Sequence, residues 1–150
     1  MMDVLWRGGV IVALGVVTWL VVAGGRAFVG GRQRRALAAP PLLDGGTNGL
    51  VRILAFSSDT CRQCHTHQWP AVQRVLAQRV GRIVVEEVDA PSHPDLAERY
   101  RILTVPSTVV LDGDGQVRAV NYGFANTQKL LEQVDALIKG AMTAEMATRA

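Results

Sequence analysis

The sequence has few cysteines and almost no net charge outside its N-terminal region. Two cysteines in 150 residues are too few for a small scaffold held together by disulfides. Residues 1–35 carry five arginines and one aspartate, a charge of +4, so the net charge of +3 leaves −1 for the rest of the chain. This nearly neutral remainder gives no indication of nucleic-acid binding. No internal repeat is present.

A long apolar segment lies near the N-terminus. Gly8 to Gly25 is a stretch of 18 residues without a charge, which as a helix is about 27 Å long, close to the thickness of a bilayer's hydrocarbon core. Apolar neighbours extend the predicted membrane contact to residues 5–29, because Arg7 and Arg26 can place their charges at the interface. We predict one transmembrane anchor with a basic flank over residues 1–35. The sequence predicts no oligomeric state.

The arginines around this segment predict its orientation. Arg26, Arg32, Arg34 and Arg35 follow the apolar run, and the positive-inside rule places such a cluster, with the domain after it, in the cytoplasm. Two alternatives remain open: an anchor of the opposite orientation, and a signal peptide cleaved at the small-residue site 36–38. The signal peptide fits less well, because its positive charge normally precedes the apolar core.

The rest of the chain predicts a linker over residues 36–48, an α/β domain over 49–140 and a frayed tail over 141–150. Pro40-Pro41 and Gly45-Gly46 break regular structure in the linker. A strand, a helix and a strand within about 40 residues predict a right-handed crossover between parallel strands. Predicted strands span 50–57, 83–88, 108–111 and 116–122; predicted helices span 61–78, 92–100 and 126–140.

Three details of this domain are predicted from local patterns. Pro70 should kink the first domain helix, because it removes a backbone donor. The apolar stripe of that helix includes Val80. Ser92 and Asp95 have the spacing of a capping box for the second helix. The fold class is therefore α/β, a four-stranded mixed sheet with helices on both faces.

The cysteines form the motif Cys61-Arg62-Gln63-Cys64, directly after an apolar strand and at the start of a helix. This context indicates a redox pair. The helix N-terminus lowers the thiol pKa of Cys61, which predicts Cys61 as the nucleophile and Cys64 as the resolving thiol. Arg62 and His65 could add positive charge near the thiolate. The only redox group that we expect is the Cys61–Cys64 disulfide; no separate cofactor or metal is predicted.

Three features together resemble the thioredoxin superfamily. They are Cys61-x-x-Cys64 after a central strand, Val105-Pro106 before the third strand, and the hairpin 110–117 followed by Gly123 and a closing helix. With its leading apolar segment, the chain also resembles small membrane-anchored thioredoxin-like proteins of actinobacterial type.

This resemblance implies a cis peptide at Pro106 that keeps metal from the thiols and presents the backbone of Val105 to an extended substrate. It also implies a substrate groove that includes Thr60, Thr104, Val105 and the 122–124 region, with Arg62 and Gln63 as further active-site support. The implied partners are protein thiols or disulfides and an upstream electron donor.

The chain departs from the family pattern at four places near the motif. Between the cysteines, Arg62-Gln63 replaces the typical Gly-Pro, and Thr60 replaces the tryptophan that usually precedes the first cysteine. Ala55 occupies the position of a buried aspartate, and the lysine that usually lies beside this aspartate falls at about Val85. The opening strand and helix of full-length thioredoxins are absent. Without the buried acid the family's proton-transfer helper is missing, so fast general-base assistance to Cys64 is not expected. Together with Arg62-Gln63 this indicates that the chain is not a general-purpose thioredoxin, and the anchor predicts a narrower range of clients.

The function predicted from these observations is a membrane-anchored thiol–disulfide oxidoreductase that reduces protein disulfides. If the domain lies outside the cytoplasm, disulfide handling or cytochrome c maturation is the alternative. Cys61-x-x-Cys64-His65 also matches a c-type haem attachment motif. A zinc site of Cys61 and Cys64 with His65 or His67 and a remote His93 is another alternative, as is a non-catalytic redox sensor.

Overall fold

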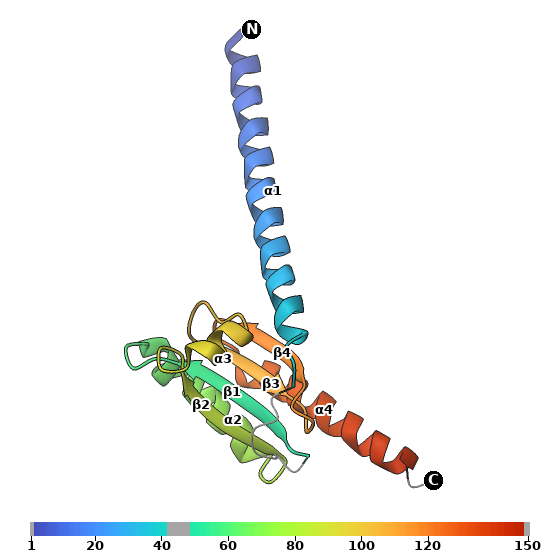
Figure 1. Ribbon diagram of the computed structural model, residues 1–150. Helices are drawn as coiled ribbons and strands as arrows, with labels where there is room; N and C mark the ends of the chain where they lie inside the picture. The colour runs from blue at the N-terminus through green and yellow to red at the C-terminus, as the bar shows by residue number, and fades with distance from the viewer. Residues whose placement is uncertain (1, 42–48, 149–150) are drawn as a thin grey trace. The chain divides into compact units, whose positions relative to one another are not determined.

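The computed structural model describes residues 2–41 and 49–148 and divides the chain into two units at Arg34/Arg35. The N-terminal unit is helical, and the second unit contains the sheet (Figure 1). Each unit is described below by itself.

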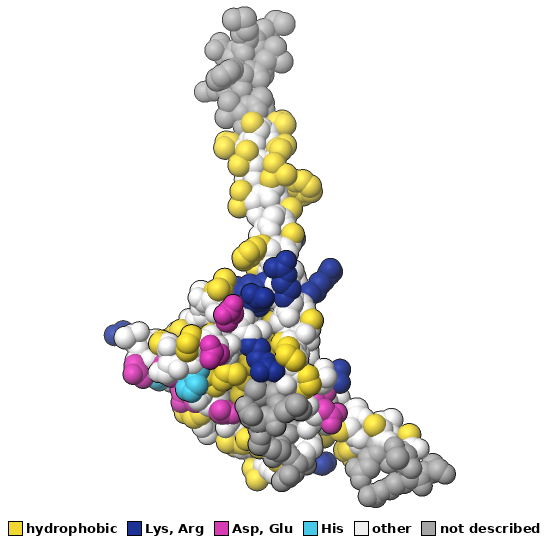
Figure 2. Space-filling view, viewed as in Figure 1, with side chains coloured by type: hydrophobic (Ala, Val, Ile, Leu, Met, Phe, Trp, Pro, Cys, Tyr) yellow, Lys and Arg dark blue, Asp and Glu magenta, His cyan; other side chains and the backbone are white. Residues whose placement is uncertain are grey.

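Helix α1 (Met2–Leu37) is one continuous helix of 36 residues. From Val12 to Val29 its large apolar side chains are exposed, as Figure 2 shows, and Lys and Arg side chains gather toward its C-terminal end. By length and composition the stretch Val12–Leu37 could cross a membrane, although a signal sequence near an N-terminus passes the same test. The predicted anchor thus coincides with one long apolar helix, which continues two residues beyond the predicted basic flank.

The sheet of the second unit contains β1 (Val51–Ser57), β2 (Ile83–Asp89), β3 (Ser107–Leu111) and β4 (Val117–Tyr122). Its strand order is β2-β1-β3-β4. β1 runs parallel to β2 and antiparallel to β3, and β3 runs antiparallel to β4. The predicted four-stranded mixed sheet is confirmed. β1 is an interior strand covered on both faces, which explains its apolar run, interrupted only by Arg52 before Ser57.

Alternate residues of β1 enter two separate cores, because successive side chains of a strand point to opposite faces. Ile53 and Ala55 pack beneath α2 (Trp69–Gln78) and α4 (Thr127–Thr148), which cover one face. Leu54 and Phe56 pack on the other face, where α3 (Pro94–Arg99) and Tyr100 lie. Helices therefore cover both faces of the sheet, as predicted (Figure 1).

The segment before β1 belongs partly to the folded domain, which corrects the predicted linker. Ala36 is fully buried in the core on the α3 face, and Leu37 and Ala39 pack against the same core. The Arg99 side chain donates hydrogen bonds from Nη2 to the carbonyl oxygens of Pro40 (2.7 Å) and Pro41 (2.9 Å). We call residues 36–41 the strap. The remaining predicted linker residues, 42–48, lie outside the described residues.

Helix α4 does not end at Gly140 but continues to Thr148, so the predicted frayed tail is wrong for residues 141–148. A single glycine costs a helix only about 1 kcal/mol relative to alanine, and good helix formers such as alanine and methionine follow it. Asn126 caps the other end of α4, because its Oδ1 accepts the N–H of Lys129 at 2.9 Å.

Two smaller predictions on helix ends are also wrong. Ser92 does not cap α3; its hydroxyl and backbone N–H both bond the carboxylate of Asp89, and the helix begins at Pro94. A proline suits the first turn because the N–H that it lacks has no partner there. Val80 leaves the apolar stripe because α2 ends at Gln78, and its side chain is 78% exposed.

Candidate active site

Both parts of the predicted site lie at the same edge of the sheet. β1 ends at Ser57, and a turn then leads to Cys61, whose backbone N–H donates to the carbonyl oxygen of Ser58 at 3.0 Å. β3 begins at Ser107, which pairs with Phe56 near the end of β1. The antiparallel register therefore brings Pro106, just before β3, beside the strand end that carries the cysteine motif.

Cys61 and Cys64 form a disulfide with their Cα atoms 5.3 Å apart. Cys61 is half-buried, whereas Cys64 is only 2% exposed, so a partner molecule has better access to Cys61. The backbone N–H of Cys64 lies 3.2 Å from Sγ of Cys61 and 3.1 Å from its carbonyl oxygen. An N–H group aimed at a sulfur stabilises the thiolate form of that sulfur.

The helix after the cysteines begins as a π-helix, η1 (Cys64–Gln68), and continues as α2. The N–H of Trp69 bonds the carbonyl oxygen of Cys64, five residues earlier, which is the π pattern. The wide turn leaves Pro70 in the first turn of α2, where a missing N–H removes no helical bond. The structure thus places a π-helical segment directly before Pro70, and the predicted kink stays a prediction.

A buried glutamine holds this helix against the loop after β4. Gln68 is 3% exposed; its Nε2 donates to the carbonyl oxygen of Ala125 (3.1 Å), and its Oε1 accepts the Ala125 N–H (2.9 Å). The sequence analysis missed Gln68, because nothing in the helical pattern separates this glutamine from the exposed Gln63 and Gln73. Only its pairing with a distant backbone reveals its role.

The loop held by Gln68 carries the predicted groove residues Gly123 and Phe124. The ring of Phe124 is 46% exposed and packs edge-to-face against His67, with 6.2 Å between ring centroids. Among the described residues, no group of three or more His, Cys, Asp and Glu side chains could hold a metal ion. The cysteines, His65 or His67, and His93 are therefore not assembled into the zinc set considered above.

The remaining predicted support residues differ in their accessibility. The Val105–Pro106 peptide bond is cis, as the resemblance implies. Val105 is half-buried and Pro106 is buried, whereas Thr60, Arg62, Gln63 and Thr104 are exposed. The Thr104 carbonyl oxygen accepts a hydrogen bond from the Ser107 hydroxyl at 2.8 Å, which fixes the segment before the proline.

Neutral polar groups lie next to the position of the missing buried acid. Ala55 pairs with Thr108 across the sheet. Oγ1 of Thr108 accepts a hydrogen bond from the Asn121 amide (3.0 Å), which also exchanges two hydrogen bonds with the Gln133 amide (2.9 and 3.0 Å). The sequence analysis missed these three residues, which lie on two strands and a helix. None of them ionises in the way that an aspartate would.

No protein-family model matches the chain. A curated protein, Thioredoxin 1 of Chlorobaculum tepidum, is 26% identical over 88 residues, which cover 59% of this chain and 85% of that protein. Solved structures of similar fold include chloroplastic thioredoxin z, with a TM-score of 0.55 and 22% identity over 62% of this chain and 82% of that one.

Two further structures agree with this result. A mutant thioredoxin from Halobacterium salinarum has a TM-score of 0.54 and 22% identity over 61% of this chain and 77% of its own. Thioredoxin-2 of the malaria parasite has a TM-score of 0.54 and 19% identity over 59% of this chain and 84% of its own.

The structural comparisons show a thioredoxin-like fold. The curated relative and the Cys61–Cys64 disulfide support a thiol–disulfide oxidoreductase. Membrane anchoring and an actinobacterial origin stay predictions.

Proposed function

We propose that this thioredoxin-like chain is a membrane-anchored thiol–disulfide oxidoreductase that reduces disulfides of protein partners. The observation that carries the proposal is the asymmetry of the Cys61–Cys64 disulfide, with one accessible cysteine and one that is 2% exposed. This asymmetry supports Cys61 as the residue that meets the client and Cys64 as the residue that resolves the mixed disulfide. The N–H of Cys64 near Sγ of Cys61 supports the same assignment.

The proposed reaction is a two-step exchange that starts from the dithiol form. The Cys61 thiolate attacks one sulfur of a client disulfide; a bond forms between these two sulfurs, and the other client sulfur leaves and takes up a proton. The Cys64 thiolate then attacks Sγ of Cys61, which releases the second client thiol and closes the protein disulfide. Two electrons pass to the client, and an upstream dithiol donor returns the protein to its reduced form.

Deprotonation of Cys64 proceeds here without a buried carboxylate. Ala55 occupies the family position of that group, and its neighbours Thr108 and Asn121 are neutral. General-base assistance by a positioned side chain typically contributes 10²- to 10⁴-fold to a rate. We therefore expect resolution of the mixed disulfide to be slow relative to its formation, which suits a protein with few clients.

The membrane part of the proposal rests on α1. Its apolar stretch Val12–Leu37 is long enough to cross a bilayer, and arginines follow the apolar core. The positive-inside rule favours a cytoplasmic domain, where the glutathione and thioredoxin pools keep thiols reduced. This compartment favours the reducing direction.

Trapping of intermediates tests the assigned roles. In membranes that contain Cys64→Ser, mixed disulfides with client proteins should accumulate through Cys61, because no second thiol can release the client. Non-reducing electrophoresis and mass spectrometry would identify the linked cysteine. The matched control is Cys61→Ser, which should trap little. Adducts that form chiefly through Cys64 would reverse the assignment.

A fusion after Ala150 tests the membrane side. A fluorescent protein that matures only in the cytoplasm should be bright, and a phosphatase that folds only outside should be inactive. The reverse result would move the domain out of the cytoplasm and favour disulfide handling or cytochrome c maturation over cytoplasmic reduction.

A further inference from the structure

The strand order leaves one side of β2 without a neighbouring strand. β2 comes first in the order β2-β1-β3-β4, and in the described part of the chain only β1 pairs with it. Figure 1 shows β2 as the outer strand on its side of the sheet. The outer side of such a strand carries N–H and C=O groups with which another chain can pair.

The hydrogen bonds at the two ends of β2 show which of its backbone groups face this open side. The carbonyl oxygen of Arg82, just before β2, and the N–H of Ala90, just after it, bond β1 at 3.3 and 2.9 Å. Backbone groups of successive residues in a strand point to alternate sides, so the even-numbered residues of β2 bond β1. The N–H and C=O groups of Val85 and Glu87 therefore face the open edge.

Two adjacent carboxylates lie on this edge strand. Glu87 is exposed; its Oε1 accepts a hydrogen bond from the Ser57 hydroxyl at 2.8 Å, and it makes no ion pair within the described residues. Glu86 points to the opposite face of the sheet, where its side chain is 52% exposed and its Oε2 lies 3.7 Å from Nη1 of Arg52. The uncompensated charge of the edge is therefore on the face of Glu87.

These charges determine which kind of strand fits the edge. β2 reads Ile-Val-Val-Glu-Glu-Val-Asp and contains no basic residue. Charged side chains on an edge strand oppose pairing with another edge that does not complement them. The β2 strand of a second copy would bring two further glutamates, whereas a segment with a basic residue would neutralise Glu87. The edge thus favours a basic segment over a second copy of the chain.

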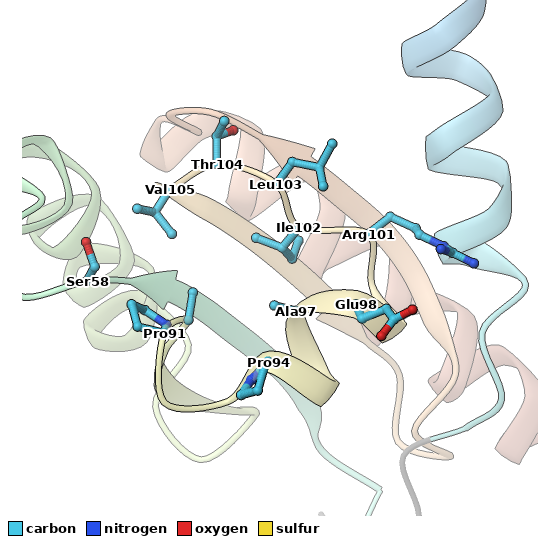
Figure 3. Close-up of a pocket in the computed structure, with 11 residues that line it drawn as sticks. Ser58, Pro91, Pro94, Ala97, Glu98, Arg101, Ile102, Leu103, Thr104 and Val105 are labelled. Atoms are coloured by element: carbon cyan, nitrogen blue, oxygen red, sulfur yellow. The ribbon is translucent and has the colours of Figure 1, made fainter.

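Apolar residues accompany the carboxylates on the same strand. Val84 is 37% exposed and shares a face with Glu86, and Val85 is half-buried and shares a face with Glu87. Figure 3 shows a different surface, a cavity of about 660 Å³ between α3 and the segment before the cis proline, and no residue of β2 lines it. The open edge is therefore separate from that cavity.

We propose that the open edge of β2 binds an extended segment of a partner protein, which adds to the sheet as an antiparallel strand. The N–H and C=O groups of Val85 and Glu87 bond the partner backbone, and the antiparallel direction gives the more stable pairing. A basic side chain lies opposite Glu87, and apolar side chains two and four residues later lie opposite Val85 and Ile83. The inference concerns a surface outside the disulfide site and does not depend on the proposed function.

Two fluorescent peptides test this inference on the full-length protein in detergent micelles. The lysine peptide has lysine, valine and valine at alternate positions, with threonine between them; the glutamate peptide has glutamate in place of the lysine. Fluorescence anisotropy measures the affinity of each. We expect saturable binding of the lysine peptide and an affinity for the glutamate peptide that is about fivefold weaker, because like charges then lie opposite each other.

Glu87→Lys should exchange this preference, so that the glutamate peptide binds about fivefold more tightly than the lysine peptide. Such an exchange requires the peptide's charged residue to lie close to position 87. The matched control is Glu132→Lys, which makes the same change of charge at an exposed position of α4. This control should keep the wild-type preference.

Val85→Pro tests the backbone pairing. It removes the N–H that faces the open edge and no bond to β1, and edge strands accept proline at such positions. We expect the affinity for the lysine peptide to fall about tenfold, because a backbone hydrogen bond is lost and the ring obstructs the partner strand. Val85→Ala, which shortens the side chain and keeps the N–H, should lose less than about threefold. If Val85→Pro does not fold, the charge exchange at Glu87 decides.

Absence of saturable binding would overturn the inference, and so would a preference between the peptides that Glu87→Lys leaves unchanged. Affinity that a folded Val85→Pro protein retains in full would show that the peptide does not add to the sheet. A wild-type dimer that Val85→Pro converts to a monomer in sedimentation would assign the edge to a second copy of the chain and overturn the inference as well.

Discussion

At the scale of single residues, Tyr100 stands out because it is completely buried. Its ring packs edge-to-face against Phe56, with 6.2 Å between centroids. In the part of the chain that the structure describes, its hydroxyl has no hydrogen-bond partner. Burial raises the pKa of Tyr100 above its ordinary value, although the nearby charges of Arg99 and Arg52 act in the opposite direction.

We predict that Tyr100→Phe keeps the free energy of unfolding at pH 8 or raises it by about 1 kcal/mol, because a buried hydroxyl without a partner is removed. The raised pKa adds a pH dependence. Well below pH 10 the tyrosine is neutral in both the folded and the unfolded protein. As the pH rises above 10, the tyrosine ionises first in the unfolded protein, because its pKa in the folded protein is raised. The wild-type protein therefore loses stability as the pH rises toward the pKa of the folded state. Tyr100→Phe lacks this loss, and urea unfolding at pH 8 and pH 11 would measure it.

Tyr122→Phe is the control for this experiment. The Tyr122 hydroxyl donates to the carbonyl oxygen of Tyr100 at 3.3 Å, so its removal should lower the free energy of unfolding at pH 8. A clear loss of stability at pH 8 in Tyr100→Phe would show that its hydroxyl makes a stabilising interaction, and would contradict the prediction.

At the scale of elements, the reciprocal bonds between Gln68 and Ala125 join the π-helix beneath the disulfide to the loop that carries Phe124. Gln68→Leu would leave the buried N–H and C=O of Ala125 without these partners. Unsatisfied buried groups cost about 1–3 kcal/mol each, so we predict that the free energy of unfolding falls by roughly 2 kcal/mol or more. Urea unfolding would measure this loss.

Gln73→Leu, on the exposed side of α2, is the control and should change the free energy of unfolding by less than about 0.5 kcal/mol. Equal effects of the two changes would contradict the role of Gln68.

The sequence predicted which helices and strands form better than it predicted the residues at which the helices begin and end. The strands follow from apolar runs bounded by turn residues, such as the hairpin turn over 112–115. The ends of α2, α3 and α4 depend on small energies that neighbours override. Gly140 is one example, since the penalty of one glycine is smaller than the gain from continuing the helix. The π-helix before Pro70 is another, because no periodicity distinguishes it from an α-helix in so short a segment.

At the scale of the whole molecule, the folded domain includes the strap, residues 36–41, whereas the sequence predicted that the domain begins at residue 49. Ala36, Leu37 and Ala39 pack against the core on the α3 face. The strap thus adds apolar side chains to this face of the sheet.

We predict that a soluble domain beginning at Arg35 is more stable than one beginning at Gly49, by roughly 3 kcal/mol. The estimate combines about 1 kcal/mol for each of the three apolar side chains of the strap that pack against the core, one of them fully buried and two partly buried, with a modest gain from the hydrogen bonds of Arg99. Urea unfolding of both domains would measure the difference. Arg99→Ala in the longer domain is the matched control and should lose only part of it. Equal stability of the two domains would show that the strap is only a tether.

The sequence by itself determined the features that depend on neighbouring residues: the apolar N-terminal helix, the strand before Cys61-x-x-Cys64, the hairpin, and the position of Pro106. Each follows from a local pattern of apolar residues, turn residues or motif spacing. Only the tertiary structure decided which distant groups meet. It paired Gln68 with Ala125, placed Thr108, Asn121 and Gln133 beside Ala55, and packed the strap into the core. These contacts depend on strand register and helix packing across the sheet, and no spacing along the chain encodes them.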